Sequence, residues 1–276
     1  MAFDNVPYAL NSVPDIAPGV NGIEINPNAR CAGAIEQAYA FFAETGPYAD
    51  DLGPKKRDQK AVGAGWKPNP TVGGFGVKMA GSTGYFSGAG HELSAWSREC
   101  LFVYGASGLQ TLSGMIEGGA ADRDFYVDAN GKIRAFIFSN SGYYATGTTT
   151  LVVGQAYHAV VTASAAGGLN VYLNGVLEAT TSIPDGGHTG YTNPALRIGY
   201  NQFGNTTNTI FYHIEYNSAL SAADVMHRYL NQMEMFQAAR PRIMVGAAAA
   251  PATNDNSTRF IRIPGASMGM TRISGG

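Results

Sequence analysis

The sequence predicts an all-β fold, an antiparallel sandwich of two sheets with one short helix near its C-terminal end. The first reason is composition: 36 glycines and 15 tyrosines stand beside only 14% charged residues, as expected of many short strands joined by tight turns. The second is an alternation of apolar and polar residues over several short stretches. The third is a pair of Asn-Gly steps, at residues 130–131 and 174–175, which favour hairpin turns.

We expect the chain to divide into three parts. Residues 1–29 are rich in proline, which fixes φ and removes a donor for sheet hydrogen bonds, so they predict an extended N-terminal arm. Residues 30–238 form the sandwich, because sandwiches of this size commonly fold as one domain. Residues 239–276 form a C-terminal linker and a strand-like arm.

The C-terminal arm carries Phe260, Ile261 and Ile263 after an alanine-rich linker. A strand-like segment can add to the sheet edge of a neighbouring chain and gain main-chain hydrogen bonds there. We therefore expect these three residues to make assembly contacts in an oligomer, with copies of this chain or with other proteins.

The first element of the sandwich that the residues define in detail is a hairpin. Ile133, Ala135 and Ile137 alternate with more polar residues, as a half-buried strand requires. The preceding turn at residues 128–131 ends in Asn-Gly, which tolerates positive φ. Residues 125–127 should therefore pair with residues 133–135.

A second hairpin and several further strands follow along the chain. Residues 169–173 and 176–179 should pair about Asn174-Gly175 for the same reason. Clusters of Gly, Asn or Thr separate the other apolar stretches. These stretches predict strands at residues 151–153, 157–163, 196–200 and 210–216.

One helix is predicted near the end of the sandwich. Ser221 can accept a backbone hydrogen bond as the N-cap, and Asp224 takes the place of the capping-box Glu. The apolar residues that follow fall on one helical stripe, so we expect the helix to pack on the sandwich edge. The stripe consists of Val225, Tyr229, Met233 and Phe236.

Four blocks of sequence, in order, resemble the laminin G-like jelly roll of the concanavalin A-like lectin/glucanase superfamily. The blocks are GQAYHAVV at 154–161, LNVYLNGV at 169–176, LRIG at 196–199 and YNSALSAADV at 216–225. Upstream, residues 74–81, 85–86 and 93–96 are similar to the family's early strands. The resemblance covers residues 30–238 and implies a concanavalin A-like jelly roll.

This chain departs from the family pattern at two places. Ala156 stands where the family usually has Trp before Tyr-His, and the acidic residue that often precedes the closing strand is replaced around Phe211 and Tyr212. These departures argue against transferring a family calcium site to this chain.

The segment after the sandwich resembles the tails of structural proteins of tailed bacteriophages. Residues 239–245 read ARPRIMV and lead into an alanine-rich stretch. The resemblance implies a virion structural or decoration protein, made in the host cytoplasm, that binds other virion proteins or copies of itself. It does not separate a capsid location from a tail location.

The sequence carries no recognisable catalytic apparatus, so we expect a protein that is not an enzyme. Glycanases of this fold place closely spaced acids on one strand, but Glu215 has no acidic neighbour two residues away and is expected at the surface or on the concave face of a sheet. Residues 265–269 match the nucleophile-elbow pattern, but no histidine follows them. His158 is expected to be structural.

Two loop segments carry the chemistry of sugar recognition. Tyr143 and Tyr144 offer aromatic faces, and Tyr191 and Asn193 offer a ring and a planar amide. Buried tyrosines also fill sandwich cores, so both interpretations remain open. The alternative function is accordingly a carbohydrate-binding module, which could engage a host surface glycan with or without an assembly role.

The net charge, the possible metal ligands and the cysteines indicate few binding partners. The net charge of −2 gives no basis for nucleic-acid binding, and no apolar stretch is long enough to span a membrane. We expect no cofactor or metal. Asp122, Asp124 and Asp128 could offer oxygen ligands to calcium, but solvated hairpin residues are the favoured interpretation. Cys31 and Cys100 are expected to be buried thiols, and their pairing stays open.

Overall fold

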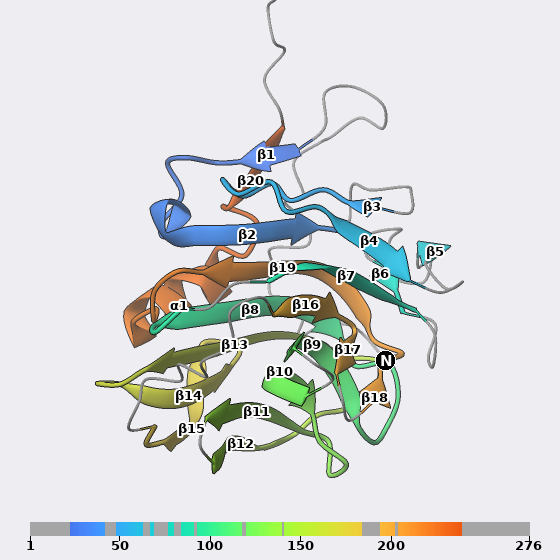
Figure 1. Ribbon diagram of the computed structural model, residues 1–276, viewed down its shortest axis with the longest axis vertical. Coiled ribbons are helices and arrows are strands. Elements are labelled where there is room, and N and C mark those ends of the chain that lie inside the picture. Colours follow the sequence, from blue (N-terminus) through green and yellow to red (C-terminus); the bar gives the residue numbers. More distant parts are fainter. Residues whose placement is uncertain are drawn as a thin grey trace, which may run out of the picture. The chain divides into compact units, whose positions relative to one another are not determined.

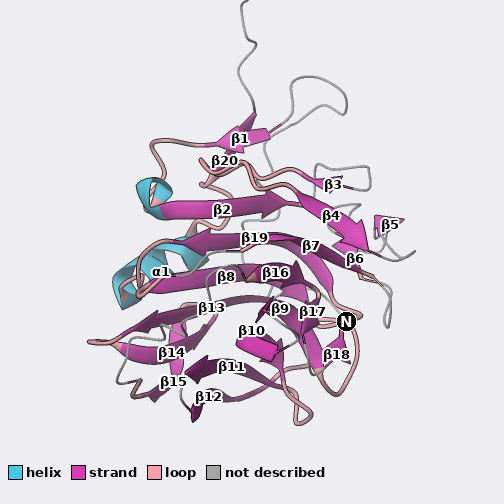
Figure 2. Ribbon diagram, viewed as in Figure 1, coloured by secondary structure: helices cyan, strands magenta, loops and turns pink. Residues whose placement is uncertain are grey.

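Two large antiparallel β-sheets make up most of the part of the chain that the structure describes (Figures 1 and 2). The computed structural model describes residues 23–41, 48–62, 67–68, 77–79, 84–90, 93–117, 120–139, 141–183, 194–201 and 204–238. Within them lie one α-helix and a single 3-10 turn, Ala32–Ala34. The predicted all-β sandwich with one short C-terminal helix is confirmed.

The first sheet has eight strands in the order β12-β11-β10-β9-β16-β7-β4-β3. The strands are β3 (Tyr48–Ala49), β4 (Gln59–Val62), β7 (Tyr85–Ala89), β9 (Gln110–Glu117), β10 (Ala120–Val127), β11 (Lys132–Ser139), β12 (Ser141–Thr150) and β16 (Ala195–Ile198).

The second sheet follows the order β15-β14-β13-β8-β19-β6-β5, and β2 also pairs with β19. Its strands are β2 (Ile35–Ala40), β5 (Lys67–Pro68), β6 (Val77–Lys78), β8 (Trp96–Val103), β13 (Ala156–Ser164), β14 (Gly168–Leu173), β15 (Val176–Thr181) and β19 (Thr209–Tyr216). Two small sheets pair β1 (Ile23–Ile25) with β20 (Phe236–Ala238) and β17 (Tyr200–Asn201) with β18 (Gly204–Asn205).

The main core lies between the two large sheets. Alternate side chains of each sheet point into it, among them Phe125 and Ile133 from the first sheet and Phe102 and Val161 from the second. All four are fully buried. Because successive side chains of a strand point to opposite faces, the residues between them lie on the outer faces of the sheets.

Both predicted hairpins are confirmed with their registers. Phe125 pairs with Ala135 and Val127 with Ile133, around a turn in which Gly131 has a φ of 73°. In the second hairpin Leu173 pairs with Val176. Asn174 and Gly175 between them both have positive φ. The Asn-Gly steps therefore set these registers, as local turn chemistry predicts.

Residues 151–153 form no strand but lead into a turn at residues 152–155, so the strand predicted there is wrong. Val152 and Val153 are 54% and 50% exposed, and the amide of Gln155 donates to the carbonyl of Val152. Gly154, with a φ of 85°, reverses the chain into β13. The predicted strands at residues 157–163 and 210–216 are confirmed as β13 and β19.

The helix α1 (Ala222–Leu230) begins as predicted but ends earlier. Ser221 accepts a hydrogen bond from the amide of Asp224, and the Asp224 carboxylate accepts one from the amide of Ser221. Met233 and Phe236 lie beyond the helix, although both are buried. Phe236 belongs to β20, because it pairs with Ile25 of β1. The single predicted stripe was therefore wrong beyond Leu230.

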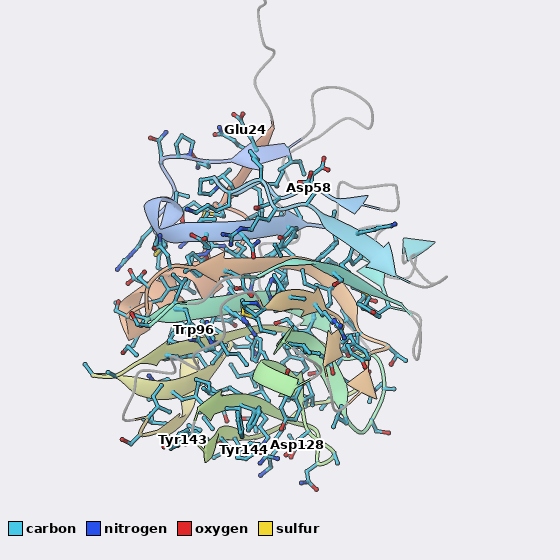
Figure 3. All side chains as sticks on the ribbon, in the orientation of Figure 1. Glu24, Asp58, Trp96, Asp128, Tyr143 and Tyr144 are labelled. Atoms are coloured by element: carbon cyan, nitrogen blue, oxygen red, sulfur yellow. The ribbon has the colours of Figure 1, made fainter. Side chains whose placement is uncertain are left out.

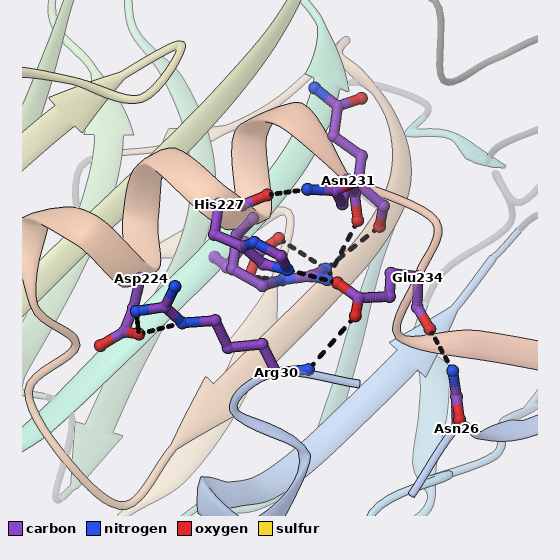
Figure 4. Close-up of polar contacts among 9 residues, drawn as sticks. Asn26, Arg30, Asp224, His227, Asn231 and Glu234 are labelled. Atoms are coloured by element: carbon purple, nitrogen blue, oxygen red, sulfur yellow. Dashed lines mark hydrogen bonds and ion pairs between the residues drawn. The ribbon is translucent and has the colours of Figure 1, made fainter. Parts of the chain in front are cut away.

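The helix packs on the outer face of the second sheet. Val225 contributes to a second buried apolar cluster with Val160, Ile214 and Tyr216 from that sheet. The segment before β2 is tied to the helix region by polar contacts: Arg30 pairs with Asp224 at 2.6 Å, and other contacts join Asn26, His227, Asn231 and Glu234 (Figure 4). This face of the second sheet is therefore covered.

The predicted boundaries of the arms and the sandwich stay predictions. Residues 1–22 and 239–276 lie outside the described residues. Residues 23–25 of the predicted N-terminal arm form β1 and pair with β20. No helix in the described part of the chain is long and apolar enough to cross a membrane.

Candidate functional site

The outer face of the first sheet carries aromatic and arginine side chains, where a solvated strand face would carry small polar ones. Three neighbouring strands contribute residues in register: Tyr144 of β12 lies opposite Phe136 of β11, and Arg134 of β11 lies opposite Tyr126 of β10. Cross-strand partners on one face lie close enough for their side chains to touch. The result is a first patch of stacked groups.

The first patch is held together by ring stacking. The guanidinium of Arg134 lies 4.1 Å from the centroid of the Tyr144 ring and 6.0 Å from that of Tyr126. The rings of Phe136 and Tyr144 are 4.7 Å apart, and Phe138 lies 6.5 Å from Phe136. Tyr126 and Phe136 are buried at its base, whereas Tyr144 and Phe138 are 41% and 44% exposed. The patch thus presents two aromatic rings and a cation to solvent.

A glycine beside the first patch makes room for its central ring. A Cβ atom at Gly142 would lie 2.9 Å from Cε2 of Phe136, closer than carbon atoms pack. Gly142 stands opposite Phe138 in the β11–β12 register. A side chain at this position would therefore push the Phe136 ring out of its stack.

A second patch with the same chemistry lies farther along the same sheet. The guanidinium of Arg197, on β16, lies 5.5 Å from the Tyr85 ring centroid and 5.2 Å from that of Tyr200. Tyr85 and Tyr200 stack on each other at 4.8 Å with an interplanar angle of 27°. Arg197 is again half-buried on aromatic rings.

The strand register places the two patches on one continuous face. Phe136 lies opposite Asp124, Asp124 opposite Gly114, and Gly114 opposite Arg197. Gly114 contributes no side chain to this row, so β9 does not separate the patches there. We call this surface the aromatic–arginine face. It consists of Tyr85, Tyr126, Arg134, Phe136, Phe138, Tyr144, Arg197 and Tyr200.

The charge of this face is mainly positive. Burial raises the pKa of Tyr126 to about 12, against the opposing effect of Arg134, so its hydroxyl stays protonated at neutral pH. Asp124 is only 2% exposed. An apolar ring surface combined with a few placed hydrogen-bond donors is the usual composition of a small-ligand site.

The structure separates the two neighbouring tyrosines that the sequence proposed together. Tyr144 is on the aromatic–arginine face, whereas Tyr143 is half-buried against the core between the sheets; both lie on β12 (Figure 3). Tyr191 and Asn193 lie outside the described residues, and so do the assembly residues Phe260, Ile261 and Ile263.

Sequence reasoning missed most of this face, although one signal was present. Ile133, Ala135 and Ile137 predict the inner side of β11, so the positions between them should be polar. Phe136 and Phe138 occupy two of those positions. Aromatic residues on the solvent side of a strand indicate a binding surface or a covered one.

Two of the three aspartates considered for calcium, Asp124 and Asp128, are buried, and the side chain of Asp122 lies outside the described residues. Asp128 is 7% exposed, and its Oδ1 accepts hydrogen bonds from the amides of Asn130 at 2.8 Å and Lys132 at 3.0 Å. It therefore fixes the hairpin turn. Asp124 is also buried, so the expectation that these are solvated residues was wrong for both. The described residues contain no group of three or more His, Cys, Asp or Glu that could hold a metal ion.

A buried polar network ties α1 to the outer face of the second sheet. Both oxygens of Glu99 accept hydrogen bonds from Arg228, at 3.0 and 3.1 Å. His158 lies 3.0 Å from the same carboxylate. The hydroxyls of Tyr212 and Tyr216 donate to it at 2.8 and 2.5 Å. His158 thus makes a structural contact, as expected.

The Glu99 carboxylate is held charged by this network. Burial by itself would raise the pKa of Glu99, but the charges and hydrogen bonds of Arg228 and His158 outweigh it and hold that pKa well below its usual range. Every side chain of the network is buried. The network therefore stabilises the fold and offers no accessible acid.

Glu215 is buried between the sheets, so the expectation of a surface or concave-face carboxylate was wrong. Its oxygen lies 2.8 Å from Nε of Arg98, and both side chains are at most 1% exposed. Trp96 packs beside them, 5.1 Å from the guanidiniums of Arg98 and Arg123. Alternation along β19 explains the position, because Ile214 and Tyr216 face the helix and Glu215 must face the other way.

The free thiols differ in burial. Cys31 and Cys100 are both unpaired cysteines, and Cys100 is fully buried whereas Cys31 is half-buried. Burial raises the pKa of both thiols, that of Cys31 to about 11. The expectation of buried thiols therefore fits Cys100 fully and Cys31 in part.

Two sheets packed face to face, with the register described above, define a concanavalin A-like jelly-roll sandwich of the lectin-like class. Residues 93–226 match the family model of the concanavalin A-like lectin/glucanases superfamily. The laminin G-like resemblance is thereby confirmed. No curated protein is similar enough in sequence to count as a relative.

Solved structures share the fold at low identity. The binding domain of botulinum neurotoxin DC, in complex with rat synaptotagmin II, is 13% identical with a TM-score of 0.57, over 72% of this chain and 52% of that chain. A Trypanosoma rangeli sialidase in complex with a difluoro-KDN is 14% identical with a TM-score of 0.55, over 79% and 37%.

Botulinum neurotoxin type C, described as depending on two ganglioside molecules to enter cells, is 12% identical with a TM-score of 0.56, over 72% of this chain and 51% of that chain. The present chain spans about half or less of the length of these three proteins. Likeness at this level of identity establishes the fold alone.

Proposed function

We propose that this chain is a non-enzymatic glycan-binding module whose ligand lies on the aromatic–arginine face. The observation that carries the proposal is the first patch, in which Tyr144 and Phe138 are exposed beside the guanidinium of Arg134. Aromatic rings that lie together on the solvent side of a strand mark a surface that a ligand or partner protein covers. A sugar ring fits both parts, since its C–H face packs on an aromatic ring and its hydroxyls accept from arginine.

Two of the similar structures concern sugar ligands: a sialidase in complex with a difluoro-KDN, and a botulinum neurotoxin that depends on gangliosides to enter cells. These ligands belong to those proteins, and their sites are not transferred here. They support the proposal only in that sandwiches of this fold occur in sugar-binding proteins. The location of the site rests on the side chains of this chain.

The proposal that the protein is not an enzyme rests on its carboxylates. Glycoside hydrolysis requires two carboxyl groups on opposite sides of one scissile bond. In the described part of the second sheet, Glu99 faces the helix and Glu215 faces the core between the sheets, so no substrate could lie between them. Incubation with the best-bound oligosaccharide should release no shorter products, and detectable release would refute this part.

The experiment that tests glycan binding is an array screen followed by titration of the strongest ligand. Tyr144→Ala should weaken binding by about tenfold or more, equivalent to about 1.4 kcal/mol. Val176→Ala is the matched control, because Val176 is 57% exposed on β15 of the other sheet. Equal affinity of Tyr144→Ala and the unmodified protein would contradict the proposed site.

We further propose that the module acts as a virion structural or decoration protein. Its support is the resemblance of residues 239–245 and the alanine-rich stretch after them to tails of tailed-bacteriophage structural proteins. In this setting the chain is made in the host cytoplasm, and Phe260, Ile261 and Ile263 bind neighbouring proteins or copies. Deleting residues 239–276 should abolish incorporation into particles while glycan binding persists. Unchanged incorporation would refute the assembly role.

A further inference from the structure

We infer that the aromatic–arginine face selects a glycan that carries anionic groups, carboxylate or sulfate, which bind Arg134 and Arg197. The inference rests on the proposed glycan-binding function and names the class of its ligand. It starts from the hydrogen-bonding state of the arginines.

Arg134 and Arg197 are unusual among the arginines that the structure describes. Arg30, Arg57, Arg98 and Arg228 each form an ion pair with a carboxylate, and Arg123 donates to the carbonyl of Leu93. In the same described residues, Arg134 and Arg197 have neither an ion pair nor a hydrogen bond to an acceptor. Their Nε atoms are buried and unsatisfied.

An unpaired, half-buried guanidinium is costly unless a ligand completes it. Arginine has five N–H donors and no acceptor, and a buried donor without a partner destabilises the folded protein. The rings of Tyr144 and of Tyr85 with Tyr200 hold the two guanidiniums by cation–π contact. The N–H groups on the terminal Nη atoms remain available to a carboxylate or sulfate, which can accept two parallel hydrogen bonds.

The other charges of the face favour an anion as well. Lys132 alternates with Arg134 on β11, and Lys60 lies opposite Ser87, which lies opposite Arg197. Both lysines therefore share the outer face, and Lys60 is exposed. Among the residues of this face whose side chains the structure describes, the one carboxylate is that of Asp124, which is 2% exposed.

The spacing of the arginines favours an oligosaccharide over a single sugar. Arg197 lies three strands from Arg134 in the sheet and two residues farther along the strand direction. Strand spacing and residue rise place their Cα atoms about 16 Å apart. One sugar ring cannot contact both arginines, whereas an extended acidic chain can. Nucleic-acid-binding surfaces commonly contact about 6–10 phosphates with Lys and Arg, whereas the described residues of this face supply two arginines and two lysines.

Matched pairs of oligosaccharides test the inference without changing the protein. Tetragalacturonic acid is compared with its carboxyl-reduced form, and a carrageenan tetrasaccharide with its desulfated form, by calorimetry at low salt. At least one acidic member should bind about tenfold or more tightly than its neutral counterpart, with affinity falling as salt screens the charges. The pair that shows the difference identifies carboxylate or sulfate as the group recognised.

Variants then locate the recognition. Arg134→Gln and Arg197→Gln should each reduce affinity for the acidic member about tenfold more than affinity for the neutral member, so the preference for the acidic member falls by about tenfold. Arg30→Gln is the control, since Arg30 is an exposed arginine near α1. Thermal unfolding of each variant checks that the fold is intact.

The outcomes separate this inference from the proposed function. Equal affinity for acidic and neutral members, or a preference that survives both arginine variants, would overturn the inference and leave glycan binding standing. Tighter binding of an oligothymidylate than of any acidic glycan would also overturn it. Absence of binding to every glycan, on the array and by calorimetry, would overturn the proposed function as well.

Discussion

Replacing Glu99 by Gln should destabilise the protein by several kcal/mol. The substitution keeps the volume of the side chain but removes the charge that Arg228 pairs with, and all partners are buried. It also places an N–H donor next to the hydroxyls of Tyr212 and Tyr216, which donate to this side chain in the unmodified protein. Two donors then face each other. Arg228 then remains as a buried charge without a counter-charge.

The size of the effect follows from the burial. Breaking a buried ion pair by removing one partner costs about 3–5 kcal/mol, whereas the whole fold of a domain is stable by only about 5–15 kcal/mol. For a chain of this size the loss should lower Tm by roughly 6–20 °C. Glu234→Gln should cost at most about 1 kcal/mol, because Glu234 and its partner His227 are about one-third exposed.

Urea unfolding followed by tryptophan fluorescence measures both variants. The Glu99→Gln midpoint should fall well below that of Glu234→Gln, with a similar dependence of the unfolding free energy on urea concentration. A double variant, Glu99→Leu with Arg228→Met, should recover much of the loss because no charge stays buried alone. A Glu99→Gln loss no larger than that of Glu234→Gln would refute the network as a major source of stability.

Three further predictions concern acid, glycine and thiol chemistry. The network lowers the pKa of Glu99 below its ordinary 4.5. The ionised carboxylate therefore contributes its full stabilisation of the fold above pH 4.5, and this stabilisation declines as pH falls. The urea midpoints of wild type and Glu99→Gln should accordingly converge in acid. Gly154→Ala should cost about 1–2 kcal/mol for its positive φ. Gly168→Ala should cost about 1–3 kcal/mol more by thermal unfolding, because its Cβ would lie 2.6 Å from the Thr181 carbonyl; equal costs would contradict the close approach. A thiol reagent at pH 8 should label Cys31 slowly and Cys100 only after unfolding, and rapid labelling of Cys100 would contradict its burial.

Local chemistry explains which elements the sequence could predict. The Asn174-Gly175 turn and the Ser221 cap each depend on a few neighbouring residues, and both appear as predicted. The end of the helix could not be predicted in this way. Met233 and Phe236 continue the apolar period of the helix, but pairing of Phe236 with Ile25, more than 200 residues earlier in the chain, draws the chain into β20.

The candidate site was harder to predict than the fold because it combines residues from separate strands. Tyr144 could be found from its neighbouring tyrosine, but nothing local relates it to Arg134 or to Arg197. Only the register of β10, β11, β12 and β16 brings these side chains onto one face. Glu215 shows the same limit, because its burial depends on Arg98 lying opposite it on β8.

The measurement that tests the central claim most directly is an amide chemical-shift titration of the labelled protein with tetragalacturonic acid and with the oligosaccharide that binds best on the array. The account predicts saturable shifts clustered around Arg134, Tyr144 and Arg197, with residues near α1 unchanged. Shifts confined to another surface, such as the exposed Leu177 and Leu230, or no shifts with either glycan, would contradict it.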